Sequence, residues 1–188
     1  MEVYEAIRRR RSVRSFDGKP VAREKLERII EAAALAPSAH NSQPWHFHVT
    51  SGAARDAVCD VVSLSTVHLQ EYLEMLPTEE LEAAERFFAG LGGAPVVIAV
   101  SVSVAEDDLG RINTLLSTGC AIENLMLAAG EEGLACCNVT FAFWVRDKLV
   151  ELLEIAPDRE IVSLLLVGAP TEIPAPTQRR TDVATFLG

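Results

Sequence analysis

The spacing of hydrophobic residues along this chain predicts several amphipathic helices. Between residues 22 and 36, Leu26, Ile29, Ile30 and Ala33 recur at i, i+3, i+4 and i+7, which is the apolar stripe of a helix packed on a core. Pro37 follows directly and ends this helix. Shorter helices are predicted over residues 2–10, 53–62 and 147–155.

Three apolar runs have the length of strands rather than of helices. In residues 45–50, Phe47 and Val49 alternate with His46 and His48, the period of a half-buried strand. The continuous runs PVVIAVSV after Gly92–Gly93 and residues 161–167 predict buried strands. The order of helices and strands favours an α+β fold, with a sheet packed between helices.

A long helix is predicted over residues 111–133, and its apolar residues populate more than one face. They include Ile112, Leu115, Leu116, Ile122 and Leu125. A helix that is apolar on several sides either lies at the centre of a domain or is covered by a partner chain.

Composition narrows the class of protein. The 188 residues predict one domain, residues 1–188, with 49% hydrophobic residues and a net charge of −10. An acidic total argues against nucleic-acid binding, and the apolar runs are too short to cross a bilayer. No signal peptide is apparent. The four cysteines (Cys59, Cys120, Cys136 and Cys137) lack zinc-ligand spacing and are expected to be reduced core thiols of a cytoplasmic protein.

Against this acidic background, five arginines crowd into residues 8–14, at positions 8–11 and 14. A second pair, Arg179 and Arg180, lies near the other end of the chain. Arginine forms bidentate hydrogen bonds with phosphate and stays charged, so both clusters could meet on one phosphate group. Taken alone, the run also allows a solvated helix face, which the pattern favours, or a nucleic-acid contact.

Residues that commonly act as catalytic groups or metal ligands do not occur here in the spacing that such sites require. The sequence shows no nucleophile triad, no carboxylate pair and no metal-ligand cluster, and its four histidines do not lie at metal spacing. The GLGG run at residues 90–93 precedes a strand, so it is not a dinucleotide fingerprint. A phosphate-binding site without catalytic side chains suggests a cofactor that supplies the chemistry. The acidic residues 66–92 predict either a mobile excursion over a site or a solvated helical face.

Four motifs, in order, resemble the FMN-dependent nitroreductase family: RRSVRSF at 10–16, PSAHNSQPWHF at 37–47, GCAIENLMLAA at 119–129 and QRR at 178–180. The resemblance implies a central, mostly antiparallel sheet flanked by helices. It also implies a long central helix at the interface of an intertwined homodimer.

The resemblance assigns the FMN phosphate and ribityl chain to Arg10, Arg11, Ser12 and Arg14. Arginine forks and a hydroxyl donor suit a phosphate near charge −2. The terminal pair completes this site, with Arg180 favoured over Arg179. Arg8 and Arg9 fall outside the motif and are expected on the surface.

The loop of the second motif implies contacts with the isoalloxazine ring from the other subunit. Its residues in this sequence are Pro37, Ser38, Ala39, Asn41 and Gln43. Trp45 is interpreted as core, and Asn124 as a residue that positions the central helix.

The chain also departs from the family pattern. Many relatives carry a mid-chain cation near the flavin pyrimidine edge, but residues 56–85 contain no Lys or Arg, and Arg111 is a poor substitute. Ser117-Thr118 stand where relatives often have an acidic residue. The backbone N–H that faces flavin N5 is expected somewhere in residues 137–140.

The resemblance implies ping-pong chemistry in which NADH or NADPH reduces FMN and a small-molecule acceptor, such as a nitroaromatic or a quinone, reoxidises it. FMN bound in this way carries the chemistry at N5, without catalytic side chains or a metal. The alternatives are other flavin reactions of the same fold (FMN fragmentation, reductive dehalogenation or azoline oxidation) and a non-catalytic flavin- or nucleotide-binding protein.

Overall fold

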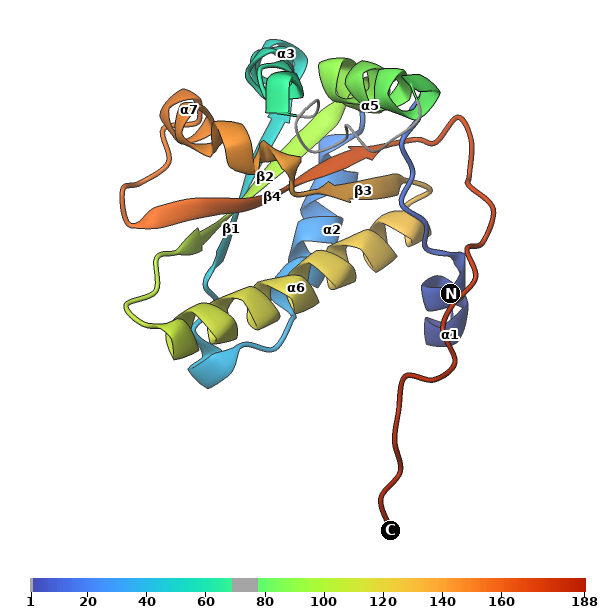
Figure 1. Cartoon of the computed structure of the whole chain (residues 1–188), viewed down its shortest axis with the longest axis vertical. Helices are drawn as coiled ribbons and strands as arrows, with labels where there is room; N and C mark the ends of the chain where they lie inside the picture. The colour runs from blue at the N-terminus through green and yellow to red at the C-terminus, as the bar shows by residue number, and fades with distance from the viewer. Residues whose placement is uncertain (1, 69–77) are drawn as a thin grey trace.

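An antiparallel sheet forms the centre of the computed structural model, which describes residues 2–68 and 78–188 (Figure 1). Within these residues the sheet has four strands in the order β1-β2-β4-β3. Their bounds are β1 Trp45–Ser51, β2 Val96–Ser103, β3 Ala135–Val139 and β4 Arg159–Gly168. All three strand pairs are antiparallel.

The burial of each strand follows from its place in the sheet. Strands β2 and β4 are central and covered on both faces, so their continuous apolar runs are almost wholly buried. Strand β1 is an edge strand, and the predicted alternation there is only partly correct. Phe47 packs against the core, but Val49 is 40% exposed on the open edge, while Thr50 is buried and donates to the Val97 carbonyl.

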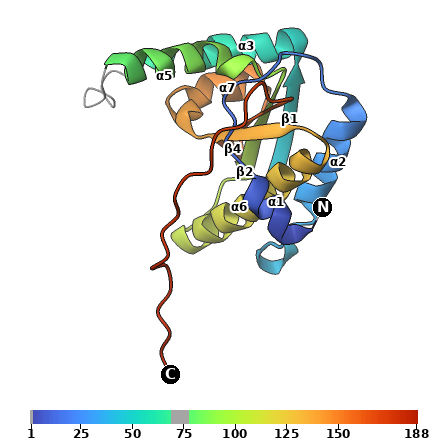
Figure 2. The same ribbon diagram turned by 90° about the vertical axis from the view of Figure 1, so that its right-hand side faces the viewer.

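Helices cover both faces of the sheet (Figures 1 and 2). On one face lie α2 (Arg23–Ala34) and α6 (Asp108–Glu131), and on the other lie α3 (Gly52–Ser63), α5 (Thr78–Gly90) and α7 (Arg146–Leu152). The short helix α1 (Val3–Arg9) packs on α6. The predicted α+β class, with helices flanking an antiparallel sheet, is therefore confirmed.

Helix α6 is the long helix that the sequence predicted. It begins at Asp108, three residues earlier than expected, because the Asp107 side chain accepts a hydrogen bond from the Gly110 N–H and caps the first turn. Asn124 donates to the Ala32 carbonyl of α2 at 3.2 Å, so it positions the helix as predicted. Leu116 is 67% exposed on a side of α6 that the rest of the chain leaves uncovered.

In the acidic region 66–92, residues 78–90 form the helix α5, which agrees with the helical alternative, whereas 69–77 lie outside the described residues. Two expectations need correction. Residues 135–139 form a fourth strand, β3, which was not predicted from the sequence. Three of the free cysteines are buried as expected, but Cys120 is exposed, because it lies on the uncovered side of α6.

Within the described ranges, no helix combines the length and the apolar character needed to cross a membrane.

Candidate functional site

The predicted phosphate-binding residues lie on an extended segment beside the edge strand β3. Ser12 forms a parallel bridge with Cys136, and the Val13 N–H donates to the Cys136 carbonyl at 3.1 Å. Side chains alternate along an extended chain, and Val13 points into the core, where it is 2% exposed. The alternation consequently directs the side chains of Arg10, Ser12 and Arg14 to the opposite side of the segment, away from the core.

Arg10 reaches helix α6. Its Nε lies 3.2 Å from Glu123 Oε1, and its side chain is more buried than that of its partner, at 22% against 48% exposed. The pairing holds the guanidinium against the helix, so a ligand phosphate at this position competes with Glu123 for Arg10.

Arg11 lies on the same side of the segment as Val13 and, unlike Arg10, which reaches α6, contacts the end of α1. Its Nη1 donates to the carbonyls of Arg8 and Arg10 at 2.7 and 2.8 Å, where α1 ends. Carbonyls at a helix C-terminus lack partners within the helix, so Arg11 satisfies the end of α1. Its Nε is buried without a hydrogen-bond partner among the described residues.

Gly92 fixes the backbone beneath Arg14. The Phe16 N–H donates to the Gly92 carbonyl at 2.9 Å, and Gly92 has φ of +63°. A Cβ at Gly92 would come within 2.2 Å of the Arg14 carbonyl oxygen. Glycine is therefore required here both for its conformation and for the close approach of the two chains.

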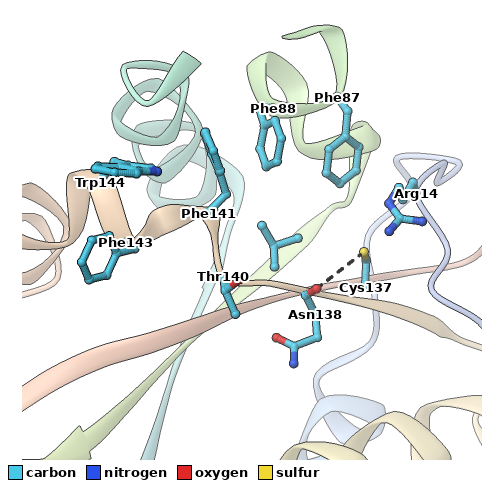
Figure 3. A pocket seen from close by; sticks show the side chains of 10 residues that line it. Arg14, Phe87, Phe88, Cys137, Asn138, Thr140, Phe141, Phe143 and Trp144 are labelled. Carbon is cyan, nitrogen blue, oxygen red and sulfur yellow. Dashed lines mark hydrogen bonds between the residues drawn. The ribbon is translucent and has the colours of Figure 1, made fainter. Parts of the chain in front are cut away.

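A cavity of about 540 Å³ opens next to Arg14 (Figure 3). Its aromatic walls come from α5, which supplies Phe87 and Phe88, and from the segment after β3. This cavity is called the aromatic cavity below, and its lining residues are Arg14, Phe87, Phe88, residues 137–141, Phe143 and Trp144.

The aromatic rings contact one another in two groups. Phe88 lies 4.4 Å from Phe141 between ring centroids and 5.1 Å from Phe87, and Phe143 meets Trp144 edge to face at 5.5 Å. Phe143 remains 58% exposed. Planar apolar walls with one cation at the end suit a flat, electron-accepting ring system.

Strand β3 forms one side of the aromatic cavity, and Figure 3 shows Cys137 directed towards Arg14, with the Asn138 side chain pointing away from the phenylalanine rings. Burial raises the pKa of the Cys137 thiol, and the nearby Arg14 guanidinium opposes that shift. Burial also raises the pKa of Cys136, to about 12. Both thiols are consequently protonated at neutral pH and are poor nucleophiles.

The backbone of β3 has a free edge beyond the arginine-bearing segment. The Cys136 carbonyl faces that segment, because it accepts from the Val13 N–H. Polar backbone groups of an edge strand alternate in direction, so the N–H and C=O of Asn138 point to the same side. Asn138 also lines the aromatic cavity, which places a backbone donor within the range 137–140 that the sequence indicated.

The second predicted motif forms a strained loop. Residues His40, Asn41 and Gln43 all have positive φ, at 51°, 55° and 44°. Ser38 Oγ accepts from the Gln43 N–H at 3.0 Å and closes the loop. Such conformations cost free energy in residues other than glycine and tend to occur at functional sites.

The structure separates this loop from the arginines within one chain. The Ala39 N–H donates to Ser117 Oγ at 3.3 Å, in the N-terminal half of α6. Arg10 instead contacts Glu123 and borders a cavity with Gly130, in the C-terminal half. At 1.5 Å per residue, Ser117 lies about 9 Å from Glu123 and about 20 Å from Gly130 along the helix axis. Pro37 and Ser38 enter the loop from the α2 end.

The terminal arginines lie on the extended tail that leaves the body of the molecule (Figures 1 and 2). Arg180 pairs with Asp182 of the same tail, with Nη2 and Oδ2 3.0 Å apart, and both side chains are largely exposed. Arg179 is exposed beside it. Within this chain Arg180 therefore contacts its own segment.

The aromatic cavity was not predicted from the sequence. Its signal was present, because four of the seven phenylalanines and one of the two tryptophans fall in residues 87–88 and 141–144. The expected mid-chain cation is absent from residues 56–85 by sequence, and Arg111 pairs with Glu160 at 2.9 Å. In the aromatic cavity, Arg14 supplies a guanidinium.

Known proteins share the sequence pattern and the fold of this chain. A model of the nitroreductase family matches residues 7–169. The chain is 28% identical to a 4-nitrobenzoate reductase of Pseudomonas putida, with 87% of this chain and 83% of that protein covered. It is 31% identical to a 5,6-dimethylbenzimidazole synthase of Rhodospirillum rubrum, with 87% and 79% covered.

Among solved structures, the FMN and NADPH-dependent nitroreductase NfnB from Sphigopyxis sp. strain HMH has the same fold. It superposes with a TM-score of 0.83 at 25% identity, and the match covers 100% of both chains. The family match spans most of this chain and includes the first three motifs that carry the resemblance. This chain therefore belongs to the nitroreductase family.

Proposed function

We propose that this protein is an FMN-dependent oxidoreductase that passes two electrons from NADH or NADPH to a small aromatic acceptor, such as a nitroaromatic or a quinone. The observation that carries the proposal is the junction of Arg14 with the aromatic cavity. There a guanidinium, a free backbone edge and flat apolar walls meet. A cavity of this chemistry suits a flavin ring and the planar molecules that exchange electrons with it.

The residues present fit FMN. Arg10 and Ser12 offer a guanidinium and a hydroxyl for the phosphate and ribityl chain, on the side of the segment that faces away from the core. Arg14 lies one step further along, at the cavity, where a cation favours the anionic reduced ring. We assign the backbone N–H of Asn138 to the ring edge. Arg11 contributes indirectly, because it holds the end of α1.

When bound, FMN supplies the two-electron chemistry. The protein's part is to orient the ring and to exclude water. Phe87, Phe88 and Phe141 exclude water from one side of the cavity. The cavity offers one such aromatic surface, so donor and acceptor occupy it in turn, which is a ping-pong order.

We further propose that two copies form a homodimer and that each flavin lies between them. Leu109, Ile112 and Leu116 are 66%, 54% and 67% exposed on one side of α6. Exposed apolar patches of this kind mark protein interfaces. In a two-fold dimer with antiparallel α6 helices, the N-terminal half of one helix lies beside the C-terminal half of the other. That arrangement brings the 37–43 loop of one copy to the arginines of its partner.

The extended tail fits the same dimer. It projects from the body in both views and ends in exposed apolar residues, with Phe186 95% and Leu187 93% exposed. A second chain would cover these side chains and would redirect Arg179 and Arg180 towards a phosphate.

A cytoplasmic location fits the reduced cysteines.

Fragmentation of FMN is the second candidate function. It is favoured by the relative named 5,6-dimethylbenzimidazole synthase, at 31% identity, and by the lack of a cation in residues 56–85. In that case reduced FMN is consumed rather than regenerated, so product analysis separates the two functions.

The test is the visible spectrum of the purified protein with added FMN, recorded anaerobically before and after NADH or NADPH. We expect flavin bands that bleach with a nicotinamide and return when a nitroaromatic or a quinone is added. A protein that binds no flavin would contradict the proposal. If the bleached bands instead return incompletely when air is admitted, with loss of total flavin, FMN fragmentation by O2 would be favoured.

A further inference from the structure

A second cleft opens beside the aromatic cavity and carries two arginines. It has a volume of about 320 Å³, and it is lined by Arg111 of α6, Arg146 of α7 and Glu160 of β4. Thr140 and Phe143 line both this cleft and the aromatic cavity, so the two spaces adjoin. It is called the arginine cleft below.

The charged groups of the arginine cleft are unequal in number. Glu160 lies between the two guanidiniums, with Oε1 2.9 Å from Arg111 Nη1 and Oε2 3.9 Å from Arg146 Nη1. Two guanidiniums and one carboxylate leave a net charge of +1. Asp147 lies 3.6 Å from Arg146 Nε, but its side chain is 96% exposed, so water weakens that pairing. Within a protein of net charge −10, this surplus is a local exception.

Phe143 connects the cleft to the aromatic cavity. The Arg146 guanidinium carbon lies 5.0 Å from the centroid of the Phe143 ring, a cation–π contact. Stacking uses the face of the guanidinium and leaves its edge N–H groups available for a carboxylate or a phosphate. The same ring lines the aromatic cavity, so an anion at Arg146 and a planar ring in the cavity would be neighbours.

We propose that Arg111 and Arg146 bind the anionic group of a substrate whose aromatic ring occupies the adjoining cavity. The proposal rests on the proposed function, because the ring is that of the electron donor or of the acceptor. The chemistry recognised is a carboxylate or a phosphate. It has two sources: a carboxylated aromatic acceptor, or the phosphates of a nicotinamide dinucleotide.

Calorimetric titration of the FMN-loaded protein tests this without turnover. Benzoate and its uncharged counterpart benzamide probe the acceptor source, and adenosine 2′,5′-bisphosphate and adenosine probe the dinucleotide source. We expect the charged member of at least one pair to bind about fivefold more tightly than the uncharged member, the effect of about 1 kcal/mol for a partly exposed ion pair. The pair that shows the preference identifies the source.

Arg111→Gln and Arg146→Gln should each reduce that preference, and the double variant should abolish it. Arg23→Gln is the matched control, because Arg23 also pairs with one carboxylate, Glu27 at 2.8 Å, but on the exposed surface of α2. It removes the same charge and should leave the preference unchanged.

Equal binding of charged and uncharged probes in both pairs would overturn the proposal. So would a preference that survives in the double variant or that falls equally in Arg23→Gln. A different observation would contradict the proposed function, namely the absence of flavin bands or of their bleaching by a nicotinamide. The two failures are therefore distinguishable.

Discussion

Replacing Gly92 with alanine tests the packing that sets the position of Arg14. At φ of +63°, an alanine costs about 1–2 kcal/mol relative to glycine. Its Cβ would also lie 2.2 Å from the Arg14 carbonyl oxygen and 2.9 Å from the carbonyl carbon. Neither atom belongs to a flexible side chain, so the backbone must move, and overpacking of this kind costs about 1–3 kcal/mol. We expect Gly92→Ala to lower the free energy of unfolding by about 2–5 kcal/mol.

Gly133→Ala provides the matched control. Gly133 has φ of +72°, but a Cβ there meets no atom within 4 Å. It therefore isolates the conformational cost of about 1–2 kcal/mol from the clash. Urea unfolding followed by circular dichroism measures both variants. FMN titration then shows whether the affinity falls more in Gly92→Ala, as it should if the clash displaces Arg14.

Equal destabilisation by Gly92→Ala and Gly133→Ala would refute the reasoning, because the clash would then have no measurable cost. A Gly92→Ala protein that is strongly destabilised but keeps full FMN affinity would separate the packing argument from the site. The position of the Arg14 backbone would then not matter for the flavin.

Three further results are expected. Arg14→Ala should weaken FMN binding by about 1.5–3 kcal/mol, the range for a hydrogen bond to a charged group, whereas Arg8→Ala should leave it nearly unchanged. Fluorescence titration with FMN compares the two variants. An unaltered affinity in Arg14→Ala would exclude the assignment of Arg14 to the FMN site. Cys120 should resist alkylation at protein concentrations that support the proposed dimer and react after dilution, and rapid labelling at every concentration, followed by mass spectrometry, would argue against burial of α6. Burial is the main cause that lowers the pKa of His48, and the neighbouring His46 and Arg159 lower it further. As the pH falls below about 6.5, His48 is therefore protonated in the unfolded chain before it is protonated in the folded one. Stability should therefore fall between pH 7 and 5, and His48→Gln should flatten that fall in urea midpoints; an identical slope in the variant would show that other groups cause it.

The elements that the sequence predicted well are those whose burial pattern is local. The stripe on α2 places Leu26, Ile29 and Ala33 in the core, as its spacing indicated. The apolar runs of β2 and β4 are central strands, because continuous apolar sequence is needed where both faces are covered. In each case, the residues that form the element also carry the signal.

What the sequence could not provide depends on contacts between distant segments. Strand β3 has five residues, one of them Asn138, and it is a strand because it pairs with β4. The opposite orientations of Arg11 and Arg14 follow from the bridge between Ser12 and Cys136, which no local pattern contains. The aromatic cavity likewise joins two segments about fifty residues apart, so its parts are visible in the sequence but their meeting is not.

The separation of the 37–43 loop from the arginines along α6 has a thermodynamic consequence. If one flavin needs both, then flavin binding and self-association are linked equilibria, and each strengthens the other by the same factor. Dilution would release flavin even from a fully folded chain, and added flavin would shift monomers towards dimers. The apparent affinity for FMN would then be a function of protein concentration, and a single dissociation constant would describe it only at a stated concentration of chains.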